Sequence, residues 1–268
     1  RPCRPSEAAP STVRQATTLR VAPLPLAPSR APASLAARIE RRAPAGKSAA
    51  QSLAAPAALG VSPAEQQRPL TRSALADMPV AFGGAGDHSA GRILCYGDSL
   101  TVGYCRGGVS FEPYGRSLAQ RLASTGAHCE VLVCGMSGRT AEDMIRKAES
   151  SMVCVAGLRG KGLRRILDED GPFDLVVIMA GTNDMGLNAS DEAIMGNLSR
   201  LHALCHQRGV PTISLAPPPA PCAGAQREAK RLHLVDRLGA ALAKLPGAVV
   251  CLDPAELVPG TVAEHWDQ

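Results

Sequence analysis

The sequence lacks several patterns that would assign it to a class at once. No run of about eighteen apolar residues occurs, so no membrane-spanning helix is expected. The nine cysteines contain no C-x-x-C pair, and an odd number of scattered cysteines argues against a disulfide scaffold or a zinc site. Several of them fall inside apolar runs, where a free cysteine behaves as a small buried side chain. An intracellular, reducing compartment is therefore expected.

Positive charge is also missing from most of the chain. Residues 91–268 contain eighteen Lys or Arg and nineteen Asp or Glu, whereas residues 1–90 contain eleven and five. The net charge of +5 therefore lies in the first third. Because the remaining two thirds carry no basic excess, a nucleic-acid partner is not expected.

The first ninety residues have almost no aromatic side chains and no sustained hydrophobic period. They are rich in Ala, Pro, Ser and Arg, which cannot bury enough apolar surface to offset chain entropy. We expect a disordered tail or linker over 1–90, ending at the glycine-rich stretch 81–86. The same composition is typical of organelle transit segments, which is the alternative. The chain begins with Arg1, so we expect it to be a piece of a longer protein.

Residues 91–268 alternate between strand-like and helix-like patterns, which predicts one folded domain. The alternation favours an α/β fold: a three-layer α/β/α domain with a flavodoxin-like, parallel five-stranded sheet. The most continuous apolar run, 174–179, predicts a central strand that is buried on both faces. Residues 151–162 are expected to form a loop. The other expected strands are 93–96, 130–134, 210–215 and 248–252, and the expected helices are 113–124, 141–149, 163–167, 193–207 and 225–245.

Small polar clusters follow three of the expected strands: GDSL at 97–100, GMSGRT at 135–140 and GTND at 181–184. Ligands bind at the carboxyl ends of strands in open α/β sheets, so Ser99 is a candidate nucleophile. Each cluster also has an ordinary interpretation. Ser99 could cap a helix, Gly138 could supply a positive φ in a turn, and Asn183 could cap the loop that follows.

These three clusters, in this order, resemble the SGNH hydrolases, the GDSL esterase/lipase superfamily, over essentially all of 92–268. The resemblance implies that Ser99 attacks an ester carbonyl and forms an acyl-enzyme. It implies an oxyanion hole made by the N–H of Ser99, the N–H of Gly138 and the side-chain amide of Asn183. Asp98 is then expected to brace the Ser99 turn. The SGRT form of the second cluster favours arylesterase-like members that act on small acyl groups.

The fourth signature of that family, a D-x-x-H near the C-terminus that supplies the catalytic base, does not occur after Cys251. The final residues, 264–268, resemble the stretch that precedes this block, so we expect the chain to stop short of its base. His265 lies several residues too early to replace it. The remaining histidines considered are expected at the surface or beside the core, or lack a supporting motif: His128, His202, His206 and His233.

Two functions follow from this pattern. The first is an esterase, lipase or thioesterase that is complete only in the full-length protein and acts on a small ester, with no metal or organic cofactor implied. The alternative is a non-catalytic module that binds esters or glycans and lacks the base. The loop 104–114, with Arg106, Phe111 and Tyr114, is expected to shape one side of the cleft, and the proline-rich loop 216–222 another. The sequence indicates no oligomeric state.

Overall fold

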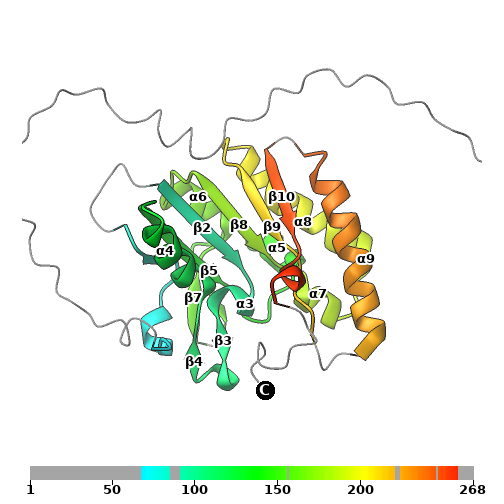
Figure 1. Ribbon diagram of the computed structural model, residues 1–268, viewed down its shortest axis with the longest axis horizontal. Helices are drawn as coiled ribbons and strands as arrows, with labels where there is room; N and C mark the ends of the chain where they lie inside the picture. Colours follow the sequence, from blue (N-terminus) through cyan, green and yellow to red (C-terminus); the bar gives the residue numbers. More distant parts are fainter. Residues whose placement is uncertain (1–67, 85–90, 156, 221–223, 246, 259–268) are drawn as a thin grey trace, which may run out of the picture. The chain divides into compact units, whose positions relative to one another are not determined.

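The computed structural model describes residues 68–84, 91–155, 157–220, 224–245 and 247–258. A six-stranded sheet in the order β1-β5-β2-β8-β9-β10 organises them (Figure 1). Its five later strands are parallel and β1 pairs antiparallel with β5. Across the sheet, the parallel strands lie in the order second, first, third, fourth and fifth, counted by their position in the chain. This order confirms the predicted flavodoxin-like sheet. The strands are β1 (Val80–Phe82), β2 (Gly91–Gly97), β5 (Cys129–Gly135), β8 (Leu175–Met179), β9 (Thr212–Leu215) and β10 (Ala248–Leu252).

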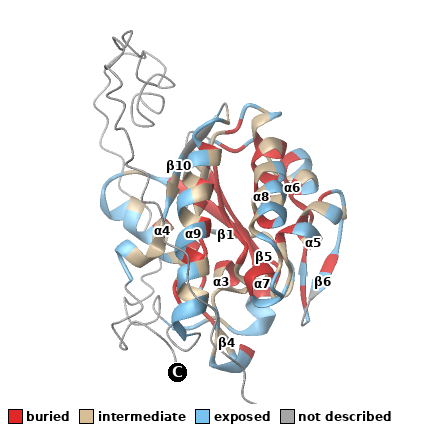
Figure 2. Cartoon of the chain, turned by 90° about the vertical axis from the view of Figure 1, so that its right-hand side faces the viewer, coloured by how far each residue is buried: buried red, intermediate tan, exposed pale blue. Residues whose placement is uncertain are grey.

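Helices cover both faces of the sheet, as the alternating pattern predicts, and Figure 2 shows the buried strands between them. On one face, Ala119 of α4 belongs to the same core cluster as Val131 and Val133 of β5. On the other face, Leu201 of α8 and Leu238 of α9 belong to the larger core cluster. The longer helices are α4 (Tyr114–Ser124), α5 (Ala141–Arg146), α6 (Leu163–Glu169), α8 (Asp191–His206) and α9 (Gly224–Leu242), and the shorter ones are α3 (Ser99–Val102), α7 (Thr182–Gly186), η1 (Arg72–Leu75), η2 (Arg106–Gly108) and η4 (Pro254–Glu256). Within the described residues, no helix is long and apolar enough to cross a lipid bilayer.

The folded part begins earlier than the sequence predicts. Leu75 and Met78 are buried in the main core cluster, and β1 pairs with β5 so that Val80 lies opposite Val133. The expected tail over 1–90 is therefore wrong for residues 68–84. A three-residue strand and isolated apolar residues show no period that a sequence pattern could detect. The rest of the tail lies outside the described residues and stays a prediction.

Two short hairpins replace segments that we expected to be loops. Residues 151–162 contain β6 (Val153–Val155) and β7 (Leu158–Gly160), which pair antiparallel. The segment after α3 contains β3 (Tyr104–Cys105) and β4 (Ser110–Phe111). Strands of two or three residues are shorter than the runs of four to eight on which the sequence prediction rests.

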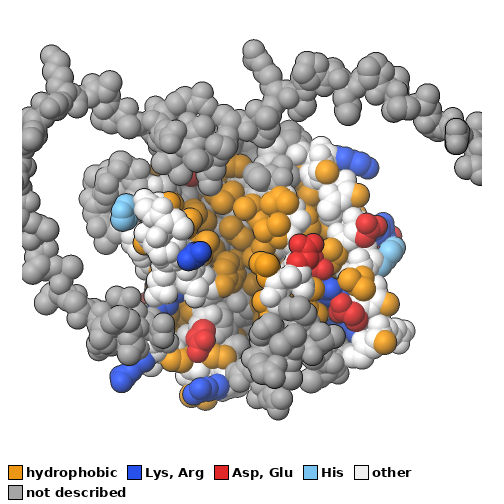
Figure 3. All heavy atoms as spheres, in the orientation of Figure 1, with side chains coloured by type: hydrophobic (Ala, Val, Ile, Leu, Met, Phe, Trp, Pro, Cys, Tyr) orange, Lys and Arg blue, Asp and Glu red, His pale blue; other side chains and the backbone are white. Residues whose placement is uncertain are grey.

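Within the described part of the chain, one corner of the sheet leaves apolar side chains uncovered. Ile213 and Leu215 of β9 are only partly buried. Their neighbours on β10, Val250 and Leu252, are 39% and 43% exposed. Figure 3 shows hydrophobic side chains gathered over the middle of this view of the sheet. The last two strands therefore present an apolar surface that α4 does not cover.

Candidate active site

The three polar clusters leave the sheet at the same edge. In the parallel register, Gly97 at the end of β2 lies level with Gly135 of β5 on one side and Met179 of β8 on the other. Figure 1 shows α3 and α7 together at this end of the sheet. The register thus brings the segments that carry Ser99, Gly138 and Asn183 side by side at the carboxyl edge.

Ser99 is half-buried in the first turn of α3, and two glycines let this turn pack tightly. A Cβ on Gly97 would lie 2.0 Å from the carbonyl oxygen of Met179. A Cβ on Gly135 would lie 2.5 Å from the Val102 nitrogen and 2.6 Å from the carbonyl oxygen of Asp98. Only glycine fits at these two strand ends, so both positions are needed to hold the Ser99 turn against β5 and β8.

Asp98 braces this turn as the sequence predicts. Its Oδ1 accepts a hydrogen bond from the Leu100 N–H at 3.0 Å, which caps α3. The side chain is fully buried, and burial raises the pKa of Asp98 to about 7 against the lowering effect of the Leu100 N–H. The nearby charge of Asp184 raises that pKa further. Asp98 is thus a buried structural carboxyl.

Gly138 lies in a tight turn that follows β5. The Arg139 N–H donates to the carbonyl oxygen of Met136 at 3.1 Å, and Gly138 has φ +74 at the third position of this turn. A positive φ at that position is the type II pattern, which favours glycine. In the described residues, the Gly138 N–H donates no backbone hydrogen bond. The turn therefore explains the glycine and leaves its N–H available to a ligand.

Two side chains tie the second cluster to the third. Asn183 Nδ2 donates to the carbonyl oxygen of Arg139 at 2.9 Å, and Asp184 Oδ2 accepts from the Ala141 N–H at 2.9 Å. The Asn183 amide is therefore oriented by one of its hydrogens, and the second hydrogen remains for another acceptor. Asp184 is 2% exposed, and burial raises its pKa. Asp184 directly follows the asparagine, but no local pattern in the sequence indicates its role.

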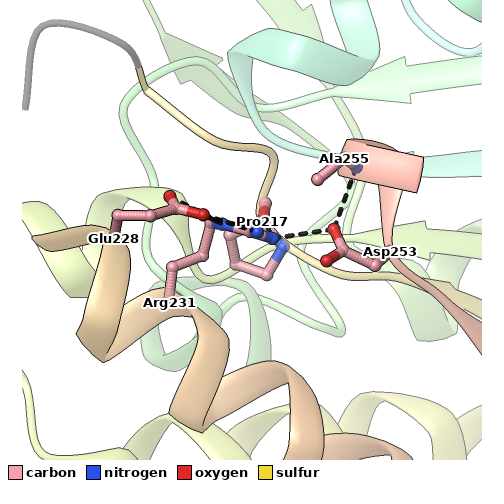
Figure 4. A network of polar contacts seen from close by, with 5 residues as sticks. All are labelled: Pro217, Glu228, Arg231, Asp253 and Ala255. Atoms are coloured by element: carbon pink, nitrogen blue, oxygen red, sulfur yellow. Dashed lines mark hydrogen bonds and ion pairs between the residues drawn. The ribbon is translucent and has the colours of Figure 1, made fainter. Parts of the chain in front are cut away.

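A buried arginine fastens the remaining strand ends at this edge (Figure 4). Arg231 of α9 is 2% exposed and donates to both oxygens of Glu228, to the carbonyl oxygen of Pro217 and to Asp253 Oδ1 at 2.7 Å. Asp253 Oδ1 also accepts from the Ala255 N–H, which caps η4. Arg231 thereby joins the loop after β9 to the end of β10. A sequence signal existed, because Arg231 continues the Leu234, Leu238 and Leu242 stripe that faces the core.

The proline-rich loop borders the third cluster. Pro217, Pro218 and Ala220 line a hollow of about 20 Å³ together with Thr182 and Met185 of α7. The expectation that residues 216–222 shape one side of a cleft stays a prediction, and 221–222 lie outside the described residues.

The opposite loop differs from the expectation. Phe111 is 1% exposed and packs edge-to-face on the half-exposed Tyr104, with ring centres 5.9 Å apart. The prediction that Phe111 lines a cleft is wrong, because pairing of β3 with β4 turns it into the core. The hydroxyl of Tyr114 is buried as well.

The described histidines lie away from the Ser99 edge or belong to other contacts. His202 Nδ1 and His206 Nε2 both contact the Thr212 hydroxyl, at 2.7 and 2.8 Å, where β9 begins. Burial lowers the pKa of His202 to about 4, with help from the charge of His206. Their predicted place beside the core is confirmed. His233 is exposed and contacts Asp191, His128 is exposed, and His265 lies outside the described residues.

Within the described part of the chain, no three His, Cys, Asp or Glu side chains gather as a metal site would require. The arrangement that remains is a parallel sheet with a serine, a glycine turn and an anchored asparagine at one edge. An α/β ester hydrolase of the serine type is the class with this arrangement.

The chain belongs to the GDSL-like lipase/acylhydrolase family, whose model matches residues 95–266. Among solved structures, it is similar to AlinE4, an SGNH-hydrolase family esterase, with 21% identity and a TM-score of 0.50 over 67% of this chain and 84% of that one. It also matches a lipase/acylhydrolase from Enterococcus faecalis, with 26% identity and a TM-score of 0.45 over 64% of this chain and 81% of that one. The comparison with curated proteins found no match.

Proposed function

We propose that this protein hydrolyses small carboxylic esters through an acyl-enzyme on Ser99. The observation that carries the proposal is the level register of Gly97, Gly135 and Met179, which gathers the three clusters of the family at one edge. The nucleophile then stands where two further segments can supply hydrogen-bond donors. Membership of the family supports an ester as the substrate.

The oxyanion of the tetrahedral intermediate would be held by the N–H groups of Ser99 and Gly138 and by the Asn183 amide. Such donors accelerate acyl transfer when they are fixed before the reaction begins. The bond from Asn183 Nδ2 to the Arg139 carbonyl fixes this amide, and the Met136–Arg139 turn fixes Gly138. The SGRT form of that turn favours the arylesterase-like members, and hence small acyl groups.

We place the catalytic base in the part of the protein that follows η4. β10 ends at the same edge of the sheet as β2, so a segment that continues from η4 starts at the edge that holds Ser99. A histidine there would take the serine proton, and an aspartate would orient its imidazole. The family supplies this pair from a D-x-x-H block, which does not occur after Cys251 in the given residues.

The positions of the described histidines favour a second function, because these side chains contact Thr212 or Asp191 or lie exposed. Without a base, the same edge would bind an ester or a glycan without cleaving it. Activation of Ser99 separates the two functions, because an oxyanion hole without a base leaves the serine unreactive.

Labelling of the full-length protein with a fluorophosphonate, followed by hydrolysis of p-nitrophenyl acetate, tests the esterase. We expect labelling and turnover in the natural protein and in S117A, which removes an exposed hydroxyl on α4, and neither in S99A. Loss of the nucleophile of a triad costs about 10⁴–10⁶ in kcat. Correctly folded full-length protein without Ser99-dependent labelling would rule out the esterase in favour of the binding module.

A further inference from the structure

A second hollow, of about 450 Å³, opens between α5, α6 and α8. This volume is within the range of small-molecule sites. Its lining includes Arg200 and Leu204 in the second half of α8 and Gln207 at its C-cap, and α8 leads to the amino end of β9. The hollow therefore lies toward the end of the sheet opposite Ser99, and the esterase reaction does not use it.

The lining combines an apolar floor with a positively charged rim. Ala148 and Leu204 are buried and Ile145 is partly buried, while Arg146, Arg164 and Arg200 surround them. Glu149 is the acidic side chain of the lining, so the lining side chains together carry a surplus of two positive charges. Guanidinium groups keep their charge at any physiological pH.

The arginines retain hydrogen-bonding capacity. Arg164 donates from Nη1 to Glu149 at 2.8 Å, but its Nε is buried without a hydrogen-bond partner among the described residues. Arg200 makes a long contact of 3.5 Å with Asn197 among the residues that the structure describes. Arg146 pairs with Asp143 on its own helix. An anion in the hollow would accept hydrogen bonds from the guanidinium N–H groups that these contacts leave unused among the described residues.

We propose that this hollow binds a small organic molecule that carries a phosphate monoester. A phosphate dianion is attracted to the three guanidinium groups, and its oxygens fit the planar donors of arginine in pairs. The apolar floor of Ile145, Ala148 and Leu204 would hold the organic part. The side chains thus favour a phosphorylated compound over a neutral one.

Calorimetric titration of the full-length protein with phenyl phosphate tests the site. Arg165 provides the matched control, because it is next to Arg164 on α6 but pairs with Glu169 and does not line the hollow. We expect R164Q to bind phenyl phosphate about tenfold more weakly than the natural protein, since a charged hydrogen bond is worth about 1.5 kcal/mol or more. R165Q should bind as the natural protein does. Equal affinities of R164Q and R165Q, or no binding to the natural protein, would overturn the proposal.

The acidic member of the lining gives the reciprocal test. E149Q removes the negative charge and releases Arg164 Nη1, so it should tighten the binding of phenyl phosphate. E169Q changes the net charge of the protein by the same amount and should not tighten this binding. Inorganic phosphate should bind more weakly than phenyl phosphate, because it cannot use the apolar floor. Tighter binding in E169Q as well as E149Q, or equal affinity for the two phosphates, would contradict a built site for an organic phosphate.

Discussion

At the scale of the residue, Gly138 combines a structural requirement with a chemical one. Its φ of +74 suits the type II turn after β5, and its N–H is the proposed donor to the oxyanion. A Cβ built on Gly138 would meet nothing within 4 Å, so space does not demand a glycine there. Substitution therefore probes the backbone conformation and the position of the N–H, without a steric clash.

Gly209 offers a matched control for this residue, because it has φ +70 and open space around its Cβ, far along the chain from the site. We expect G138A and G209A each to lower the free energy of unfolding by about 1–2 kcal/mol, because an alanine is strained in the left-handed conformation. Only G138A should lose kcat, by less than the 10²–10³ or so that complete removal of an oxyanion donor costs. Denaturant unfolding and p-nitrophenyl acetate hydrolysis by the full-length protein measure the two effects. Equal kcat values for the two variants would argue against Gly138 as a donor.

Local sequence identifies some residues of the site but not others. Ser99, Gly138 and Asn183 stand in short clusters at strand ends, where local sequence carries the signal. Arg231 and Asp184 act through partners 14 to 43 positions away in the chain, such as Pro217, Asp253 and Ala141. Local patterns hold no information on such partners, so those two roles needed the fold.

At the scale of the element, α5 connects the second cluster to the rest of the molecule. It has six residues, too few for a stable helix in isolation. The Thr140 side chain caps it by accepting from the Asp143 N–H, and Asp184 accepts from the Ala141 N–H. The position of the Gly138 turn therefore depends on contacts that α5 makes outside its own sequence.

Replacement of Asp184 tests this dependence. D184A leaves the buried Ala141 N–H without an acceptor and should cost about 1–3 kcal/mol of unfolding free energy. D184N keeps an oxygen at that place and should lose less. Hydrogen exchange at the Ala141 amide should speed up in D184A and remain slow in D184N. If exchange is equally fast in both variants, the contact from Asp184 does not hold α5.

The sequence patterns predict the long helices and strands but not the short strands. The run at 174–179 predicted β8, whose five residues are all buried, and the stripe on 193–207 predicted α8. β9 starts at Thr212 and not at Val210, because Pro211 has no N–H to donate. The short strands β1, β6 and β7 are stabilised by pairing with other strands, distant or adjacent in the sequence. A hydrophobic period does not indicate such pairing.

At the scale of the whole molecule, two buried groups make stability depend on pH in opposite directions. Burial lowers the pKa of His202 to about 4, below its ordinary value of 6.5, so its contribution is present above 6.5 and is lost as pH falls toward 4. Burial raises the pKa of Asp98 from 3.8 to about 7, so its contribution is present below 3.8 and is lost as pH rises toward 7. The two effects partly cancel between these limits.

Variants of the two residues should separate the effects. On acidification from about pH 7 to pH 4, H202Q should lose less unfolding free energy than the natural protein, and D98N should lose more. Each group can change the slope by up to about 1.4 kcal/mol per pH unit. Urea unfolding across this range measures the slopes. The same slope in all three proteins would show that neither group titrates differently on folding.

The uncovered corner formed by Ile213, Leu215, Val250 and Leu252 has a thermodynamic consequence. Each square ångström of apolar surface that stays in water withholds about 25 cal/mol that burial would contribute to folding. Any apolar molecule or segment that settles on this corner binds only the folded sheet, and so raises the melting temperature by mass action. The stability of the strands that position Ser99 is therefore a property of the protein together with its surroundings.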